Sequence, residues 1–407
     1  MVNGFKNTEA GVIPDDWDIF EMISVIIKNN GIKIGPFGSQ LKKEFLTETG
    51  YKVYGQENVY GRKMDIGGRY ISKKHFKKLS SCEIKSGDFL ISMMGTIGKC
   101  MIVPRKFEPG IMDSHLIRLR INNKKLNAQL LLHLFSSKIV INQINHYSVG
   151  GIMDGLSSKI VRGISIPLPP TLTEQTAIAT ALNDIDNLIH QSERLLAKKK
   201  NIKTGAMQEL LRPKRGWERK KLGSIADVVG GGTPSTFNSR YWNGDIDWYT
   251  PTEVGNKKYI YQSIKKITTE GLENSSAKKL PIGTILLTSR ASIGDVCILM
   301  KEGCTNQGFQ SLIVKENGNN EFLYYMALTL KPIFLKMANG STFLEINPNK
   351  MKSIDISLPD IEVQNHIAQV LSDMDDEIQK LEKKIEKYKL LKQGMMQVLL
   401  TGKIRLI

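Results

Sequence analysis

The sequence has few of the residues that build metal sites, disulfide frameworks or membrane spans. Its 407 residues include four cysteines, Cys82, Cys100, Cys297 and Cys304, and no two of them form a C-x-x-C pair. This spacing argues against a zinc site or a disulfide framework. The start of the chain has no apolar signal core, and no run approaches the roughly 18 apolar residues of a membrane span. We therefore expect a cytoplasmic protein that has no membrane partner.

The sequence patterns of common enzymes are also missing. The six histidines are scattered without ligand spacing, and no H-E-x-x-H or nuclease-like acidic cluster occurs. The segment 95–100 is shorter than a P-loop and ends in Cys100 where Ser or Thr is required. The segment 347–349 lacks the second proline and the aromatic residue of an adenine methyltransferase motif. We predict no catalytic residue, metal ligand or cofactor in this chain, and we favour a binding protein over an enzyme with an unrecognised site.

The first feature that points toward a function is the net charge. The chain has 57 Lys and Arg against 40 Asp and Glu, a net charge of +17. Residues 1–170 hold 24 basic and 14 acidic residues, a net of +10, so the excess lies mainly in the first part of the chain. A basic surface favours a polyanionic partner, but many basic proteins bind no nucleic acid. The charge therefore needs a second argument.

The sequence also contains an internal duplication. The segment 87–98 (GDFLISMMGTIG) matches 283–294 (GTILLTSRASIG) at an offset of 196, and IPLPP at 166–170 recurs as ISLPD at 356–360. Trp17 pairs with Trp217 and Gly150 with Gly340, so the offset drifts only between 189 and 200. The repeated unit is about half the chain, longer than a solenoid repeat. Two copies of one unit suggest a pseudo-twofold molecule whose target also has two halves.

Each copy ends in a predicted long helix. After Pro170, Thr171 or Thr173 can cap a helix that runs from Thr173 to about Leu211, before Pro213. The apolar residues of both helices follow spacings of three and four. The first seam is Ile178, Leu182, Ile185, Ile189 and Leu196, and the second is Ile367, Leu371, Met374, Ile378, Leu381, Ile385 and Tyr388. Two matched seams predict an antiparallel coiled coil that acts as a spacer, although each helix could instead pack only on its own globular unit.

The remaining sequence predicts α+β units. Short β-branched runs such as 51–54, 89–92 and 116–121 alternate with Gly, Asn and Asp, and 126–144 is a helical stretch. We expect a first globular unit at 1–165, a central helical region at 166–212, a second globular unit at 213–355 and a distal helical region at 356–407. The predicted fold class is α+β, with two duplicated domains joined by two long helices.

The ordered motifs resemble those of the DNA-specificity (S) subunit of type I restriction-modification enzymes. They are Pro14-x-x-Trp17, GPFGSQ at 35–40, the Gly-Asp-x-Leu-Ile-Ser element before Gly-x-Ile-Gly, Gly151 or Gly340-Ser-Thr342, and PLPP-x-x-x-EQ at 167–175. Two segments depart from the family's motifs. The first copy has YSVGG at 147–151 where the second has the more typical NGST at 339–342, and the second copy has VQN at 363–365 where Glu-Gln is typical. The resemblance covers essentially the whole chain. It implies two target-recognition domains, each reading half of an interrupted DNA site, and an antiparallel coiled coil that fixes the gap.

The resemblance also implies partners. They are double-stranded DNA, two modification (M) subunits that bind S-adenosylmethionine, and restriction (R) subunits that use ATP and magnesium. The coiled coil and its adjoining faces are the expected docking surface. A methylation-only complex without a restriction partner is one alternative, and a coiled-coil adaptor that binds protein and no DNA is another.

Polar and basic residues in the presumed loops are the candidates for DNA contact. The base-reading candidates are Ser39, Gln40, Gln56, Asn58 and Thr96 in the first copy, and Thr233, Ser235, Thr252, Glu253, Arg290, Ser292 and Gln307 in the second. The phosphate-contact candidates are Lys42, Lys43, Arg62, Lys63, Arg69, Lys73, Lys74, Arg240, Lys257 and Lys258. Arg290 and Gln40 are the most informative, since Arg can bridge guanine and Gln can bridge adenine. The alternative is that the glycine-rich loops are only turns and that these side chains cap them.

Overall fold

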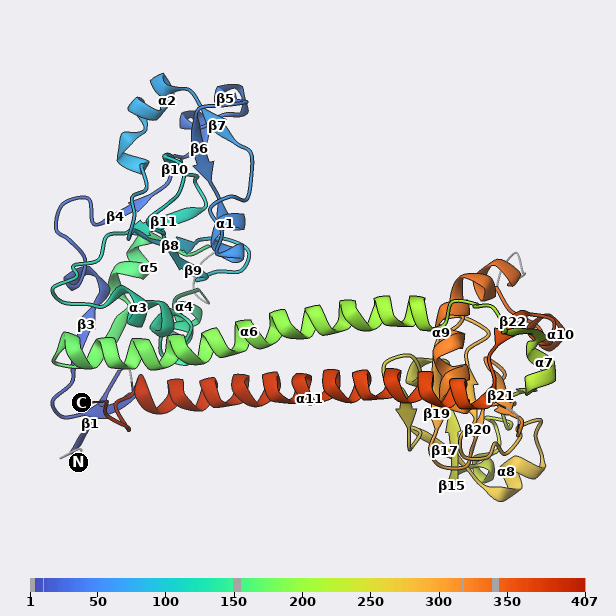
Figure 1. Cartoon of the computed structure of the whole chain (residues 1–407). Coiled ribbons are helices and arrows are strands. Elements are labelled where there is room, and N and C mark those ends of the chain that lie inside the picture. Colours follow the sequence, from blue (N-terminus) through green and yellow to red (C-terminus); the bar gives the residue numbers. More distant parts are fainter. Residues whose placement is uncertain (1–3, 10, 149–154, 317, 339–343, 407) are drawn as a thin grey trace. The chain divides into compact units, whose positions relative to one another are not determined.

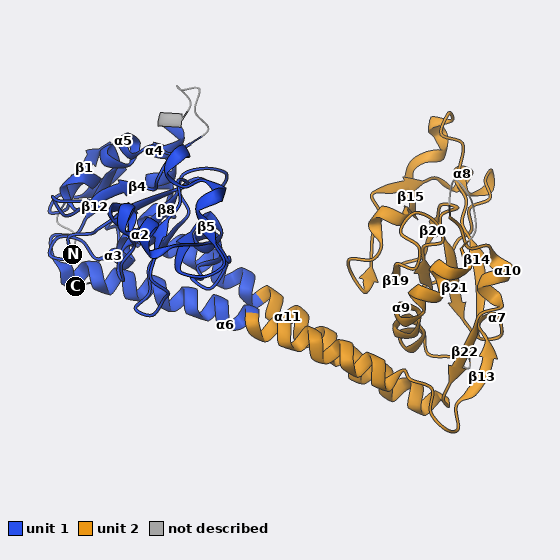
Figure 2. Cartoon of the chain, turned by 90° about the horizontal axis from the view of Figure 1, so that it is seen from above, with its two compact units in different colours: residues 1–193, 384–407 blue, residues 194–383 orange. Residues whose placement is uncertain are grey.

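A computed structural model describes residues 4–9, 11–148, 155–316, 318–338 and 344–406. The glycines that we matched at 150–151 and 340, and Ser341 and Thr342, lie outside these ranges. The chain divides into two compact units, residues 1–193 with 384–407 and residues 194–383 (Figure 2). Each unit therefore takes part of both long helices, and the four-block division of the sequence remains a prediction. None of the helices in the described ranges is long and apolar enough to cross a membrane.

The first unit contains two four-stranded sheets and two strand pairs. The antiparallel sheet has the order β4 (Ile32–Ile34), β11 (Leu116–Leu119), β8 (Phe89–Ser92), β9 (Cys100–Ile102). The mixed sheet has the order β10 (Gly110–Met112), β6 (Tyr51–Tyr54), β7 (Tyr70–Ile71), β5 (Leu46–Thr47), with β10 parallel to β6. The pairs are β1 (Phe5–Thr8) with β2 (Gly11–Pro14), and β3 (Asp18–Glu21) with β12 (Ser165–Leu168).

The second unit repeats this arrangement. Its larger sheet has the order β14 (Ala226–Gly230), β21 (Gln310–Val314), β18 (Ile285–Leu287), β19 (Val296–Leu299), β16 (Tyr259–Ile260). The smaller one has the order β17 (Lys265–Ile267), β15 (Trp242–Tyr249), β20 (Gly303–Thr305), and β15 is parallel to β20 as β6 is to β10. The remaining pair is β13 (Glu218–Lys221) with β22 (Asp355–Leu358). The strand orders agree apart from β16, which extends the larger sheet of the second unit, and β5, which extends the mixed sheet of the first. This agreement confirms the duplication and the α+β class.

Helices complete both units. Those before the central long helix are α1 (Gln56–Gly61), α2 (Lys73–Lys78), α3 (Ala128–Phe135), α4 (Lys138–Ser148) and α5 (Ser158–Gly163). Those of the second unit are α7 (Leu222–Ile225), α8 (Thr269–Glu273), α9 (Asn320–Met337) and α10 (Pro348–Lys352). The helical stretch predicted over 126–144 is present as two helices, α3 and α4, which are separated at Ser136 and Ser137. Both serine hydroxyls donate to carbonyls of the preceding turn, a pattern that competes with helical geometry.

The long helices are α6 (Leu172–Leu210) and α11 (Ile361–Leu399), each of 39 residues. Figure 1 shows α6 in green and α11 in red, running antiparallel. In the first unit Asp186 pairs with Lys392 at 2.6 Å and Glu193 with Lys389 at 2.7 Å. In the second unit Lys199 pairs with Glu377 at 2.6 Å, and Lys203 pairs with Asp375. Residue numbers rise on one helix as they fall on the other, which confirms the predicted antiparallel pair.

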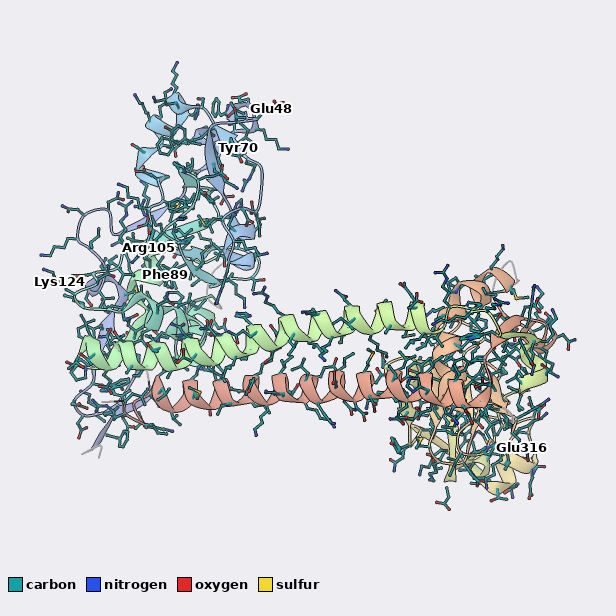
Figure 3. The ribbon with its side chains drawn as sticks, in the orientation of Figure 1. Glu48, Tyr70, Phe89, Arg105, Lys124 and Glu316 are labelled. Atoms are coloured by element: carbon teal, nitrogen blue, oxygen red, sulfur yellow. The ribbon has the colours of Figure 1, made fainter. Side chains whose placement is uncertain are left out.

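The seam residues belong to the globular cores as well as to the helix pair. Ile178 and Leu182 are fully buried in a cluster that includes Phe89 of β8 and Leu399 of α11. Figure 3 shows Phe89 among the packed side chains of the first unit. Leu371, also fully buried, lies in the corresponding cluster of the second unit. The seam residues therefore serve both proposed roles. Part of each helix packs on its own globular unit, and it also packs on the other helix.

The same hydrogen bonds recur in both copies. Asn127 caps α3, and its backbone amide donates to Gln175 Oε1 at 2.9 Å. Asn319 caps α9, and its backbone amide donates to Gln364 Oε1 at 3.1 Å. The amide groups of Gln175 and Gln364 in turn donate to the carbonyls of Pro169 and Pro359. Each glutamine thus fixes the start of its long helix against the recognition unit, which explains why Gln follows the proline segment in both copies.

Candidate nucleic-acid interface

In the first unit, a loop cluster brings two base-reading candidates together. Gln56 opens α1, and its Oε1 accepts from the backbone amide of Met94 at 3.1 Å. The Tyr60 hydroxyl lies 3.0 Å from the same oxygen and 2.8 Å from the Met94 carbonyl, and it accepts from the Thr96 amide at 3.2 Å. The exposed Tyr60 ring is therefore held rigidly beside Gln56 and Thr96. Sequence reasoning missed Tyr60, because nothing in its local pattern marks an anchored aromatic residue.

A hollow of about 600 Å³ lies next to this cluster. Arg62, Thr96 and Lys99 line it, together with apolar side chains that include Phe135 and Ile144. Burial raises the pKa of the neighbouring Cys100 thiol, and the positive charges of Arg62 and Lys99 oppose that rise. In the sequence, Lys99 stands out only within the segment 95–100, which is too short for a P-loop, and nothing there marks it as a cation at this site.

Other candidates of the first unit have exposed side chains. Ser39 and Gln40 lie in a short 3-10 turn after β4, in a segment that also exposes Phe37. The exposed cations of this unit among the phosphate candidates are Lys42, Lys43, Arg62, Lys63, Lys73 and Lys74. Arg69 is more constrained, since its guanidinium donates to Asp113 at 2.9 Å and to Glu57 at 3.0 Å.

Asn58 is not available for base reading. Its side chain is fully buried, accepts from the Gly55 amide at 2.9 Å, and donates to the carbonyls of Lys63 and Ile66 at 3.0 and 2.9 Å. These bonds satisfy both donors of the amide group and one acceptor site. For Asn58 these bonds favour the capping alternative over base reading.

In the second unit, two base-reading candidates come from separate loops and meet. Thr233 follows β14 and donates to the Oε1 of Gln307, which follows β20. Gln307 is exposed, as are Ser235, Thr252 and Ser292. The same region exposes Phe237 completely, at 101% of its reference area. An isolated exposed aromatic residue gives no periodic signal, so the sequence analysis did not single it out.

Arg290 is partly buried and already paired. Its guanidinium lies 2.9 Å from the Glu345 carboxylate, and its Nε is buried without a hydrogen-bond partner in the described part of the chain. The next residue, Ala291, has a φ of 57°, so the backbone turns sharply here. Glu345 can orient the guanidinium, and a guanine edge would have to share or replace this pairing.

Glu253 and Lys258 are engaged by neighbouring groups of the second unit, which favours structural roles for both. The carboxylate of Glu253 accepts from the Thr250 amide at 2.8 Å and from the Ile264 amide at 2.7 Å, which leaves a cap rather than a base reader. The Lys258 side chain is 10% exposed, and its ammonium donates to Glu321 at 2.9 Å, Tyr325 at 3.0 Å and Ser372 at 2.6 Å. Lys257 and Arg240 remain exposed.

The two ends of the helix pair carry related polar clusters. In the first unit buried His133 of α3 lies 2.9 Å from Asn183 and 3.9 Å from Asp186. At the matching position of the second unit, Tyr325 of α9 donates to Asp375 at 2.7 Å. In each case the carboxylate also pairs with a lysine of the opposite helix. Burial lowers the pKa of His133, so the neutral imidazole is favoured.

Glu174 corresponds to Val363 in the second copy, so the second copy has no acidic residue at this position. The contacts of Glu174 explain why the first copy has one. Arg405, near the end of the chain, donates to the carboxylates of Glu174 and Asp16 and lies 5.8 Å from the centre of the Trp17 ring. Glu174 thereby joins the final segment to the first strands of the same unit.

The described residues form no group of His, Cys, Asp and Glu that could hold a metal ion. All four cysteines are buried and unpaired. The polar loops, exposed cations and anchored aromatic ring are instead the side-chain types that contact DNA phosphates and base edges.

Comparison with known proteins gives consistent matches. Residues 14–200 and 214–388 each match the family described as type I restriction modification DNA specificity domain. The chain is 42% identical over 176 residues to the MjaIX type I specificity subunit of Methanocaldococcus jannaschii, covering 42% of this chain and 41% of that protein. It is 28% identical to the putative MjaX type I specificity subunit of the same organism, covering 98% of this chain and 96% of that one.

Solved structures share the fold. The S subunit of a type I restriction-modification system from M. genitalium aligns with a TM-score of 0.58 at 13% identity, covering 94% of this chain and 96% of that one. A chain from a structure describing the assembly and conformational transition of a type I system also aligns with a TM-score of 0.58, at 18% identity, covering 96% of this chain and 99% of that chain.

Proposed function

This chain belongs to the family of type I restriction modification DNA specificity domains, and from this membership we propose that each unit reads one half of an interrupted DNA site. The chain is the specificity subunit, the non-catalytic part of a type I restriction-modification enzyme, and it determines DNA target recognition. The observation that carries the proposal is the duplicated strand order, since two copies of one reader suit a target with two halves.

The helix pair then sets the gap between the half-sites. Each helix of 39 residues is about 58 Å long at 1.5 Å per residue. Cross-helix ion pairs in both units, such as Asp186 with Lys392 and Lys203 with Asp375, support one fixed register. The length of the helix pair would therefore determine the distance between the two half-sites of the target.

Within each unit, cations would position the DNA and loop side chains would read it. The phosphate candidates that remain are Lys42, Lys43, Arg62, Lys63, Arg69, Lys73, Lys74, Arg240 and Lys257. The base-reading candidates that remain are Ser39, Gln40, Gln56, Thr96, Thr233, Ser235, Thr252, Arg290, Ser292 and Gln307. Phosphate contacts fix orientation, whereas contacts to base edges carry the sequence information.

Partners would supply the chemistry. We propose that two modification subunits dock on the helix pair and bring S-adenosylmethionine, and that restriction subunits bring ATP- and magnesium-dependent cleavage. The assembled complex would act in the cytoplasm. A methylation-only complex is the variant of this proposal in which the restriction subunits are absent.

Electrophoretic mobility shift on genomic fragments, with and without modification subunits, tests DNA binding. Methylation-site mapping of the complex then tests the two-part target. We expect methylated sites with two specified segments and a constant gap. A single continuous motif would contradict the assignment of one half-site to each unit, and failure of the complex to bind DNA would favour a protein-binding adaptor.

A further inference from the structure

The hollow beside α1 in the first unit combines an apolar floor with a cationic rim. Val59, Phe135 and Ile144 contribute apolar surface, and Arg62 and Lys99 contribute positive charge. Apolar walls lower the local dielectric constant, which strengthens the attraction between these cations and an anion compared with open solvent. Arg62 and Lys99 therefore attract an anion more strongly in this hollow than they would on a flat, solvent-exposed surface.

Neither cation is neutralised inside the unit. Across the described residues, Arg62 and Lys99 form no ion pair, although thirty such pairs occur there. Arg62 follows α1 with a φ of 49°, a left-handed turn that ends the helix at the hollow. Lys99 follows Gly98, whose φ of 76° likewise turns the chain. Two local backbone turns thus bring unpaired cations to one site.

The second unit provides an internal comparison. Under the 196-residue offset Lys99 corresponds to Asp295, whose carboxylate accepts from Lys331 of α9 at 2.6 Å. The Lys331 side chain lies over Gly294, where an added Cβ would be 2.9 Å from its Cγ. α9 continues through this position, whereas the first copy breaks at Ser136, which lines the hollow. At this position the second copy therefore has the ion pair of Asp295 with Lys331, whereas the first copy has the unpaired Lys99.

We infer that the hollow of the first unit binds one phosphate of the DNA backbone through Arg62 and Lys99, with Thr96 and the fixed Tyr60 ring at its rim. This rests on the proposed function, since it assigns a DNA contact to the first unit. It makes the two units unequal, because the second lacks the corresponding unpaired lysine. The phosphate would anchor DNA next to Gln56 and Thr96, the polar side chains of the adjoining loop cluster.

The test uses the full chain in complex with its modification subunits and a duplex that carries the mapped target. Fluorescence anisotropy gives the affinity between about 50 and 200 mM salt, and the slope of log K against log salt reports the phosphates neutralised. We expect Arg62→Gln/Lys99→Gln to reduce the magnitude of that slope by about one, without changing the methylated sequence. The conservative double variant Arg62→Lys/Lys99→Arg should keep the slope at the wild-type value.

Two control variants separate a local contact from general charge loss. Arg105→Gln/Lys124→Gln removes two exposed charges of the same unit that do not line the hollow, and Figure 3 places Lys124 at the edge of that unit. Asp295→Asn/Lys331→Gln removes the ion pair of the second unit without changing net charge. Both should leave the slope at the wild-type value.

Three results would overturn the inference. An unchanged slope in Arg62→Gln/Lys99→Gln, with DNA still bound, would show that no phosphate contacts the hollow. An equal reduction of the slope in Arg105→Gln/Lys124→Gln would show that the effect comes from the net charge of the unit and not from a contact at the hollow. Binding of ATP or inorganic phosphate that requires Arg62 and Lys99, with an unchanged DNA slope, would identify a free phosphate compound as the ligand. Failure of the wild-type complex to bind DNA would instead contradict the proposed function.

Discussion

At the scale of single residues, neighbouring side chains decide what a charged sequence position does. Lys257 and Lys258 are indistinguishable as a basic pair in the sequence, yet the first is exposed and the second is 10% exposed. The partners of Lys258 are Glu321 and Ser372, which lie 63 and 114 residues further along the chain. Sequence reasoning could identify the charges, but it could not show that folding would use one of them internally.

The Lys258 network predicts a loss of stability on substitution. Lys258→Met leaves the partly buried Glu321 carboxylate without its cation, and breaking a buried pair costs about 3 to 5 kcal/mol. Because Glu321 keeps 30% of its side-chain exposure, we expect a loss of about 2 kcal/mol in the free energy of unfolding. Urea denaturation measures it, and Lys257→Met is the matched control that should stay within about 0.5 kcal/mol of wild type.

The pH dependence of this loss follows from the Glu321 pKa. Burial opposes ionisation, but hydrogen bonds from Ser372, Tyr259 and Lys258 outweigh it and lower the pKa. A lowered carboxylate pKa contributes stability above the unfolded pKa, and that stability is lost as the pH falls through the folded pKa. The difference in stability between wild type and Lys258→Met should therefore shrink on acidification below the ordinary glutamate pKa of 4.5. A constant difference across this range would contradict the role of Glu321.

Arg290 and Lys257 should differ in what they contribute to DNA binding. If Arg290 reads a guanine, Arg290→Ala should cost about 1 to 3 kcal/mol and relax specificity at one position of one half-site. Lys257→Ala should weaken binding to all sequences alike and flatten the salt dependence. Methylation-site mapping and binding isotherms of both variants, in complex with the modification subunits, measure this contrast. Uniform weakening by Arg290→Ala would remove Arg290 from the base readers.

At the scale of elements, strong periodic patterns were predictable and local interruptions were not. Both long helices follow from their heptad spacing and from the proline segments before them, and α6 (Leu172–Leu210) lies within one residue of the predicted bounds at each end. The break at Ser136 and Ser137 escaped prediction, because two serines in an apolar helical pattern are compatible with a continuous helix. Their hydroxyl bonds to the preceding carbonyls become visible only in the folded chain.

The helix pair predicts a change in gap length. Adding four residues to α6 within 197–200, and four to the facing part of α11 near 379–382, lengthens the pair by about 6 Å, nearly two base-pair steps of about 3.4 Å. We expect the gap of the methylated site to lengthen while both half-sites stay unchanged. Insertion into α6 alone is the control, because it displaces pairs such as Lys203 with Asp375 and should destabilise the helices. New half-sites with a constant gap would show that the helices do not set the spacing.

At the scale of the whole molecule, the duplication was readable from sequence because the helix starts and the Gly-x-Ile-Gly segments keep their spacing. The differences between the copies were not readable. The ion pair of Asp295 with Lys331, and the contact of Arg405 with Glu174, depend on residues brought together by the tertiary fold. The common architecture therefore follows from repeated patterns, whereas the individual character of each unit follows from substitutions at matched positions.

Independent recognition by the two units predicts modular exchange. Replacing residues 218–355 with the matching block of a relative exchanges the second unit's loops and sheets, including β15 and β18, and keeps both long helices. Since the first unit has its own core, with Trp17 and Phe89 fully or almost fully buried, its fold should persist in the chimera. We expect methylation-site mapping to show one new half-site, one unchanged half-site and the original gap. The reciprocal exchange of the first unit should alter the other half. Because each unit would read DNA through its own loops, a change in both halves from one exchange would mean that recognition is shared between the units.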